Sequence, residues 1–339
     1  MDTAPLLQNA DGLPSPNVMQ DHPAFLRACH SPWSFIPQNV LVILRGIVLA
    51  LVTAVVILVL NFELHEQSQF SNWRIIFDFA NISLFLVFLY QLKTFCWTFT
   101  HLYYPHHHDR HMGGIEGWLV KTMSLPKHIG SLRKQFYFTI FYTVCVCFAF
   151  ANSTIYWFIT RQHSSTNGSG EPQPESQTQP PPNGTAPAPP LQAPMPPPGT
   201  PPPQPPFTDV FGEGWFRAFI IISLYAFGSA VMVFETLVLN SIRRPWTVGI
   251  HLIGIMFAAT TYLGWAAFGH LVTNYYPFFW LDKNEVGSDE AITLYSIGFV
   301  FLAPIMYILM QGLVSSRESV TRSNSEARAI AAAQEALNS

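Results

Sequence analysis

The sequence predicts an all-α fold, a polytopic bundle of six transmembrane helices with a disordered proline-rich loop between the third and fourth. Two observations lead to this prediction. Charged residues make up only 11% of the 339 residues, whereas soluble domains contain about 25%. The apolar residues gather in six runs of roughly 22–26 residues, each long enough as a helix to cross the ~30 Å hydrocarbon core of a bilayer. The net charge of −3 comes without a basic stripe, so no nucleic-acid partner is expected.

The first half of the chain predicts a polar segment followed by three spans. Residues 1–37 are polar with scattered prolines, which indicates a disordered segment in the cytosol. They contain no long apolar run after a basic start, so we expect no cleavable signal peptide. Region 38–160 then holds the first three apolar runs, at about 39–62, 74–98 and 136–159.

The second half begins with a segment of different composition. Seventeen of the chain's 28 prolines lie between Pro172 and Pro206, so residues 161–214 are expected to form an extended, disordered loop. Region 215–315 contains the last three apolar runs, at about 216–239, 247–272 and 291–314. In the polar tail 316–339, Ser323 and Glu326 have the spacing of a capping box, which predicts a short Ala-rich helix.

The distribution of basic residues predicts the orientation. With the N-terminus in the cytosol, twelve Lys and Arg residues fall in cytosolic segments and four in outer segments, as the positive-inside rule requires. Two acceptor sequons for N-glycosylation, at Asn167 and Asn183, then lie in the outer loop. We therefore expect an integral membrane protein with both termini in the cytosol, in the plasma membrane or the endomembrane system.

Ionisable residues within the spans are candidates for function, because an unpaired charge is costly in lipid. Glu235 lies near the inner end of the fourth run and His251 near the inner start of the fifth. The short connection predicts an antiparallel hairpin in which Glu235 and His251 meet as a structural pair. The alternative is a functional site beside Arg243 and Arg244.

A second polar set lies in the outer halves of the second to fifth runs. Its members are Asp78, Asn81, Asn152, Ser153, Thr154, Ser223, Tyr225 and His270. Acid, hydroxyl and imidazole groups at one depth are the elements of a hydrolytic or ligand-binding cavity, with Asp78, Tyr225 and His270 as the candidate catalytic residues. The alternative is interhelical hydrogen bonding, the usual role of Ser, Thr and Asn in membrane bundles.

Two further patterns concern metals and cofactors. The histidine-rich tract offers four possible ligands, His106, His107, His108 and His111. Consecutive histidines cannot all face one ion, so incidental binding is expected rather than a structural metal site. No phosphate-binding, dinucleotide-binding, HExxH or GxSxG motif is present, and no cofactor is predicted. The four cysteines are expected to be buried packing residues.

The chain resembles the androgen-induced membrane proteins, which hydrolyse fatty-acid esters of hydroxy fatty acids, and their rolling-stone relatives. The resemblance covers most of the six-helix region. Its pieces, in order, are Trp73-Arg74-x-x-Phe77, Leu132-Arg133, Tyr156-Trp157, Gly214-Trp215, Glu235, Tyr262-x-x-Trp265, His270-x-Val272-Thr273 and Tyr276-Pro277-Phe278. The resemblance implies a multi-helix membrane fold, a catalytic threonine early in the second helix and a histidine in the fourth.

Neither catalytic residue of that family is present here. Phe77 stands at the threonine position, and the place of the histidine falls near Tyr225. Phenylalanine cannot act as a nucleophile, and the proline-rich insertion is a further departure. The sequence therefore favours a non-catalytic relative that binds lipid or partners. Two alternatives stay open, a lipid ester hydrolase with a rearranged site and a small transporter or channel. The ligand, the membrane and the oligomeric state are left open.

Overall fold

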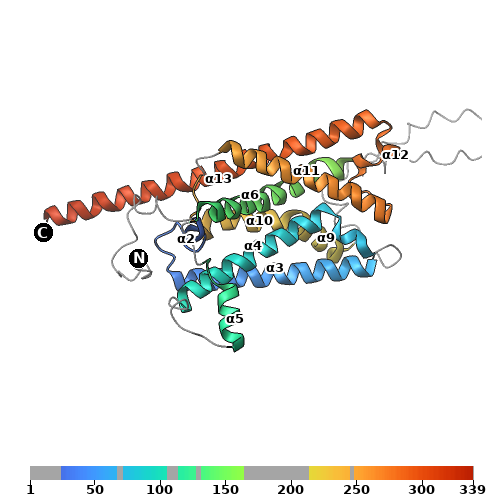
Figure 1. Cartoon of the computed structure of the whole chain (residues 1–339). Helices are drawn as coiled ribbons and strands as arrows, with labels where there is room; N and C mark the ends of the chain where they lie inside the picture. The colour runs from blue at the N-terminus through green and yellow to red at the C-terminus, as the bar shows by residue number, and fades with distance from the viewer. Residues whose placement is uncertain are drawn as a thin grey trace, which may run out of the picture.

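The computed structural model describes residues 24–66, 72–104, 114–126, 131–163, 214–244 and 248–338. Within these ranges the chain is helical and contains no strand. Six helices are long and apolar enough to cross a membrane, and they lie side by side in an elongated bundle (Figure 1). The predicted all-α six-helix architecture is confirmed, and the chain is a multi-pass membrane protein.

The spans differ in their regularity. The first, second, fifth and sixth are the α-helices α3 (Gln38–Glu66), α4 (Phe79–Tyr103), α11 (Val248–Thr273) and α13 (Asp289–Asn338). The third consists of α6 (Leu132–Ile155) and the π-helical η2 (Tyr156–Thr160). The fourth alternates between α and π turns: α9 (Trp215–Ile222), η3 (Ser223–Phe227), α10 (Gly228–Phe234) and η4 (Glu235–Leu239). Short helices lie between them: α2 (Ala24–Ala28), η1 (Asn72–Ile76), α5 (Gly114–Met123), η5 (Phe279–Leu281) and α12 (Lys283–Val286).

Helix α6 lies at the centre of the bundle, where it packs against α4, α10, α11 and α13. Its residues Cys145, Val146 and Cys147 are completely buried. By contrast, α11 presents large apolar side chains such as Phe257 and Leu271 on the outside, as expected for a surface that faces lipid. We call the end where α3 begins and η4 ends the termini end, and the end that carries α12 the loop end (Figure 1).

The N-terminal segment is ordered earlier than the sequence predicts. Disorder was expected up to residue 37, but the chain packs onto the termini end from Ala24 onwards. Phe25 is buried, with its ring 5.4 Å from that of Trp97 and 5.4 Å from that of Phe138. Trp33 Nε1 donates to Leu237 O at 2.8 Å. A few apolar anchors therefore hold a segment whose average composition is polar.

The C-terminal part of the chain also differs from expectation. No new helix begins at Ser323, because α13 runs without a break from Asp289 to Asn338. Residues 316–338 contain neither Gly nor Pro to end it. The structure describes no residue between 164 and 213, so most of the predicted loop and both sequons, Asn167 and Asn183, lie outside the described residues.

Candidate functional site

Three π-helical turns coincide with the polar residues of the bundle interior. Tyr156 begins η2, Tyr225 lies in η3 and Glu235 begins η4. π turns are rare, and they occur mostly as single turns at functional sites. The two ends of the bundle therefore each hold a candidate site, one around Asp78 and one around Glu235.

At the loop end, the segment before α4 is held against α11 by two hydrogen bonds. Tyr262 Oη donates to Phe77 O at 3.1 Å, and Trp265 Nε1 donates to Ile76 O at 2.9 Å. Asp78 follows directly as the residue that precedes α4. Its carboxylate is thus positioned by a backbone that is fixed from the neighbouring helix.

Asp78 belongs to a group of acidic and phenolic side chains contributed by four parts of the chain. It lies within electrostatic range of a carboxylate and three phenols. We call this group the loop-end cluster; its members are Glu63, Asp78, Tyr225, Tyr262 and Tyr275. Asn81 Nδ2 donates to Glu63 Oε2 at 2.7 Å, which ties α3 to α4 at the cluster. The Arg74 guanidinium lies 4.7 Å from the centre of the Tyr275 ring.

The surroundings of the cluster are poorly hydrated. Burial raises the pKa of Asp78 to about 6, against the opposing effect of the backbone N–H groups of Phe79, Ala80 and Asn81. Burial also raises the pKa of Tyr275 to about 12. Both side chains nevertheless keep some exposed surface and are only half-buried. Both groups have therefore lost most of their water while part of each side chain stays accessible.

The hydroxyl and amide groups near Tyr225 have a structural role. The π turn at η3 leaves carbonyls without helical partners, and side chains of α6 donate to them. Asn152 Nδ2 donates to Leu224 O at 2.8 Å, and Ser153 Oγ donates to Tyr225 O. The rings of Tyr156 and Tyr225 are stacked with centroids 3.7 Å apart. These contacts correspond to the interhelical hydrogen-bonding alternative considered for this polar set.

The three candidate catalytic residues do not all meet. Asp78 and Tyr225 lie within electrostatic range of each other. The ring of His270 instead stacks on Tyr276 at 3.8 Å, and its buried Nδ1 has no hydrogen-bond partner among the described residues. Tyr262 and Tyr275, which complete the cluster, were not recognised as site residues from the sequence. Tyr262 falls in the Tyr262-x-x-Trp265 pattern, and Tyr275 directly precedes the Tyr276-Pro277-Phe278 pattern.

Phe77 is the residue that the sequence resemblance was expected to place at a catalytic threonine position. Its side chain is buried, and its ring centroid lies 5.0 Å from that of Trp265. A Cβ atom added at Gly269 would lie 2.5 Å from the Phe77 ring. The phenyl group therefore fills the space beside α11 completely, with glycine as the only residue that leaves room for it.

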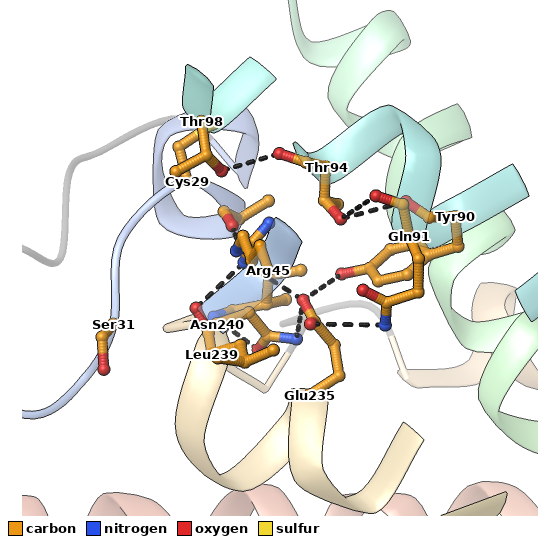
Figure 2. A network of polar contacts seen from close by, with 12 residues as sticks. Cys29, Ser31, Arg45, Tyr90, Gln91, Thr94, Thr98, Glu235, Leu239 and Asn240 are labelled. Atoms are coloured by element: carbon orange, nitrogen blue, oxygen red, sulfur yellow. Dashed lines mark hydrogen bonds and ion pairs between the residues drawn. The ribbon is translucent and has the colours of Figure 1, made fainter. Parts of the chain in front are cut away.

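At the termini end, Arg45 of α3 and Glu235 of η4 form an ion pair of 3.2 Å in which both side chains are fully buried. Arg45 Nη2 also donates to Ala28 O at 2.5 Å and to Leu239 O at 2.9 Å. Tyr90 Oη donates to Glu235 Oε1 at 3.2 Å. Figure 2 shows that the side chains of Arg45, Tyr90, Gln91 and Asn240 converge on the carboxylate of Glu235.

A second arginine completes the end of the fourth span. Arg317 of α13 is buried, and its Nη1 donates to Thr236 O at 2.7 Å and to Asn240 O at 2.8 Å. Its Nη2 donates to Ile242 O at 2.5 Å. The last carbonyls of a helix have no partner within the helix and carry partial negative charge. Arg45 and Arg317, whose side chains are both buried, together satisfy several of these carbonyls.

The expected pair of Glu235 and His251 has different partners in the structure. Glu235 binds Arg45, whereas His251 Nε2 lies 3.1 Å from Thr139 Oγ1 and its ring packs against Phe136. A carboxylate inside the bundle is best stabilised by a permanent cation with several donors. Glu235 and His251 have similar depths in the bundle, but they face different neighbouring helices and therefore do not pair.

Metal sites and relatives give no further constraint. Within the described ranges, no group of three or more His, Cys, Asp or Glu side chains is arranged to hold a metal ion. His106, His107, His108 and His111 lie outside these ranges.

No family model, characterised protein or solved structure shows a significant match to the chain.

Proposed function

We propose that the protein binds a lipid-like amphiphile at the loop-end cluster through a positively charged headgroup, without transforming it chemically. The observation that carries this proposal is the position of Asp78, which lies within electrostatic range of three phenols and a second carboxylate and yet keeps exposed surface. The positive-inside prediction puts this end of the bundle in the outer leaflet.

The chemistry of the cluster suits an amine or a quaternary ammonium group. Aromatic faces combined with a carboxylate are the usual receptor for such cations. With a pKa of about 6, Asp78 is largely ionised at neutral pH. The apolar outer surfaces of α9 and α11 would continue the site towards the acyl chains, since residues such as Phe219 and Phe268 are exposed there.

The bonding of the nearby hydroxyl groups supports a role in binding rather than catalysis. Ser229 Oγ donates to Ala149 O at 2.7 Å, and Thr154 Oγ1 donates to Phe150 O at 2.8 Å. A hydroxyl nucleophile needs a base within hydrogen-bond reach, and these groups are committed to backbone carbonyls. The family position occupied by Phe77 has no nucleophile.

Kinship with the androgen-induced family belongs to the same proposal. The positions of that family's threonine and histidine correspond to Phe77 and a site near Tyr225. Asp78, the neighbour of Phe77, lies within electrostatic range of Tyr225. The neighbour of the threonine position and the approximate histidine position, far apart in sequence, are thus within electrostatic range of each other. This is what a common ancestral site would require.

The test is a binding measurement on purified protein in detergent micelles. Lysophosphatidylcholine and a long-chain trimethylammonium amphiphile are the probes, and a long-chain sulfate is the negative probe. Asp78→Asn should weaken binding of both quaternary ammonium probes by about tenfold, the effect of losing one buried charge partner. Glu290→Gln removes an exposed carboxylate in the first turn of α13, close to the same end of the bundle, and should leave binding unchanged. Equal binding of the quaternary ammonium probes to wild type and Asp78→Asn would overturn the proposal.

A lipid ester hydrolase is the second candidate, because a carboxylate with a pKa of about 6 suits a general base at neutral pH. Release of fatty acid from ester substrates distinguishes the two functions. If wild type hydrolyses an ester and Asp78→Asn does not, while the variant still binds the quaternary ammonium probes, the enzyme is the better description.

A further inference from the structure

A separate cavity lies at the opposite end of the bundle, between the first turns of α11 and the middle of α13. Its volume is about 280 Å³, close to the lower limit of ordinary ligand sites. The residues that line it are Arg244, Val248, Leu252, Tyr307, Ile308, Gln311, Gly312 and Ser315. Ile308 is largely exposed on the lipid-facing surface, so the cavity has an apolar side wall that meets the membrane.

Two polar side chains in the wall of this cavity lack hydrogen bonds. Tyr307 is 1% exposed and Gln311 is 4% exposed. The Gln311 amide lies close enough to the Tyr307 hydroxyl to interact with it, but neither Tyr307 Oη nor the two amide atoms of Gln311 forms a hydrogen bond of good geometry among the described residues. A buried donor or acceptor without a partner is costly, and nearly all such groups in proteins are satisfied by protein, water or ligand. Both side chains line the cavity, but their polar atoms have almost no accessible surface, so the Gln311 amide would reach an occupant by rotating about its side-chain bonds.

The charge of the lining indicates what the occupant carries. Arg244 is exposed at the cavity and is the one charged residue in its lining. It lies within electrostatic range of Tyr307. One guanidinium, one phenol and one amide offer hydrogen-bond donors to an anion, and arginine is especially suited to phosphate. The positive-inside prediction assigns this end to the cytosolic leaflet, where anionic lipids are concentrated.

We propose that this cavity binds the phosphate-bearing headgroup of an anionic phospholipid, with Arg244, Tyr307 and Gln311 donating to the headgroup oxygens and the acyl chains lying along Ile308. The site is independent of the loop-end cluster. A lipid bound there would lie between α11 and α13 and would hold the two helices together at the termini end of the bundle.

Gly312 provides a direct test, because it lines the cavity and an added Cβ would have no heavy atom within 4 Å. Gly312→Leu adds a side chain at the cavity from a Cβ position that is open, and replacing a helical glycine favours the helix. Gly298→Leu is the matched control, since Gly298 is in the same helix, also has open space around its Cβ and does not line the cavity. Arg244→Gln and Gln311→Leu remove the polar donors.

The measurement is native mass spectrometry of the full chain in micelles with added phosphatidic acid, phosphatidylserine or phosphatidylcholine. The anionic lipids should bind at least about tenfold more tightly than phosphatidylcholine. Arg244→Gln and Gly312→Leu should each abolish most of this preference for anionic lipids. Gly298→Leu should keep it. Gln311→Leu should weaken lipid binding while raising the thermal midpoint of the lipid-free protein, because a buried unpaired amide is lost.

Three results would overturn the proposal. The first is equal binding of anionic and zwitterionic lipids. The second is a preference for anionic lipids that is unchanged in Gly312→Leu. The third is effective competition for the site by glycerol phosphate and inorganic phosphate. If these displace nothing at millimolar concentration, the apolar contacts contribute as a lipid ligand requires. If they compete as well as the lipid does, the site recognises free phosphate and the lipid assignment is wrong.

Discussion

Arg45 of the first span and Glu235 of the fourth form an ion pair with a distance of 3.2 Å and no exposed surface on either side chain. The pair lies where η4 ends, so Arg45 also binds the terminal carbonyl of Leu239. One side chain thus neutralises a buried carboxylate and caps a helix that would otherwise end without water or partners.

Removing either charge of this pair should destabilise the protein strongly. Glu235→Leu and Arg45→Met should each lower the free energy of unfolding by about 3–5 kcal/mol, because each leaves a buried charge without its partner. The double variant should lose less than the sum of the two. Unfolding in mixed micelles of increasing denaturing detergent provides the measurement, and strictly additive effects would show that the two charges do not interact.

Arg317 should be equally sensitive to a conservative change. Its guanidinium donates to the carbonyls of Thr236, Asn240 and Ile242 through two nitrogens. Lysine is a point charge that cannot reach these acceptors together. Arg317→Lys should therefore destabilise the protein by about 1–3 kcal/mol in the same unfolding assay. Arg322→Lys, one to two turns further along α13, should have little effect, and a similar loss in both variants would contradict the capping role.

Asp78 should make stability depend on pH. Its pKa in the folded protein is raised from 3.8 to about 6, so the folded state binds the proton more tightly than the unfolded state. The resulting stabilisation is complete below pH ~4 and is lost as the pH rises through ~6. The loss amounts to at most about 3 kcal/mol, less to the extent that solvent reaches the carboxyl group.

The comparison with Asp78→Asn keeps Glu63 and the three phenols of the cluster in place. Glu63 loses the repulsion of the Asp78 carboxylate in the variant, which adds to the difference in the same direction. The variant should be the more stable protein at pH 7.5, and the difference between the two should vanish near pH 4. Thermal unfolding at several pH values measures it. A wild-type protein that gains stability relative to Asp78→Asn as the pH rises would reverse the sign and contradict the assignment.

Gly269 should not tolerate a side chain. An added Cβ would lie 2.5 Å from the Phe77 ring, so Gly269→Ala should cost about 1–3 kcal/mol through overpacking. Adding Phe77→Leu should recover part of the loss. Gly264→Ala in the same helix has open space around its Cβ and should be neutral or stabilising by up to about 1 kcal/mol. Equal effects of the two alanine variants would show that the contact is not tight.

The sites were only partly predictable from the sequence, for reasons that particular residues illustrate. Asp78 and Tyr225 could be named because acids and phenols inside apolar runs stand out. Tyr262 and Tyr275 could not, since aromatic residues are common throughout the spans and one sequence does not show which of them lie in the same cluster. Gln311 also escaped notice, because its significance depends on a cavity and on the absence of hydrogen-bond partners among the described residues.

What the sequence determined by itself is the set of six spans, because hydropathy over a bilayer-length window is a local property of the chain. The tertiary structure decided the rotation of each helix about its axis, and with it every partnership in the interior. Glu235 and His251 have similar depths, but Glu235 faces Arg45 and His251 faces Thr139. Depth follows from position along the chain, whereas facing depends on packing against helices distant in sequence.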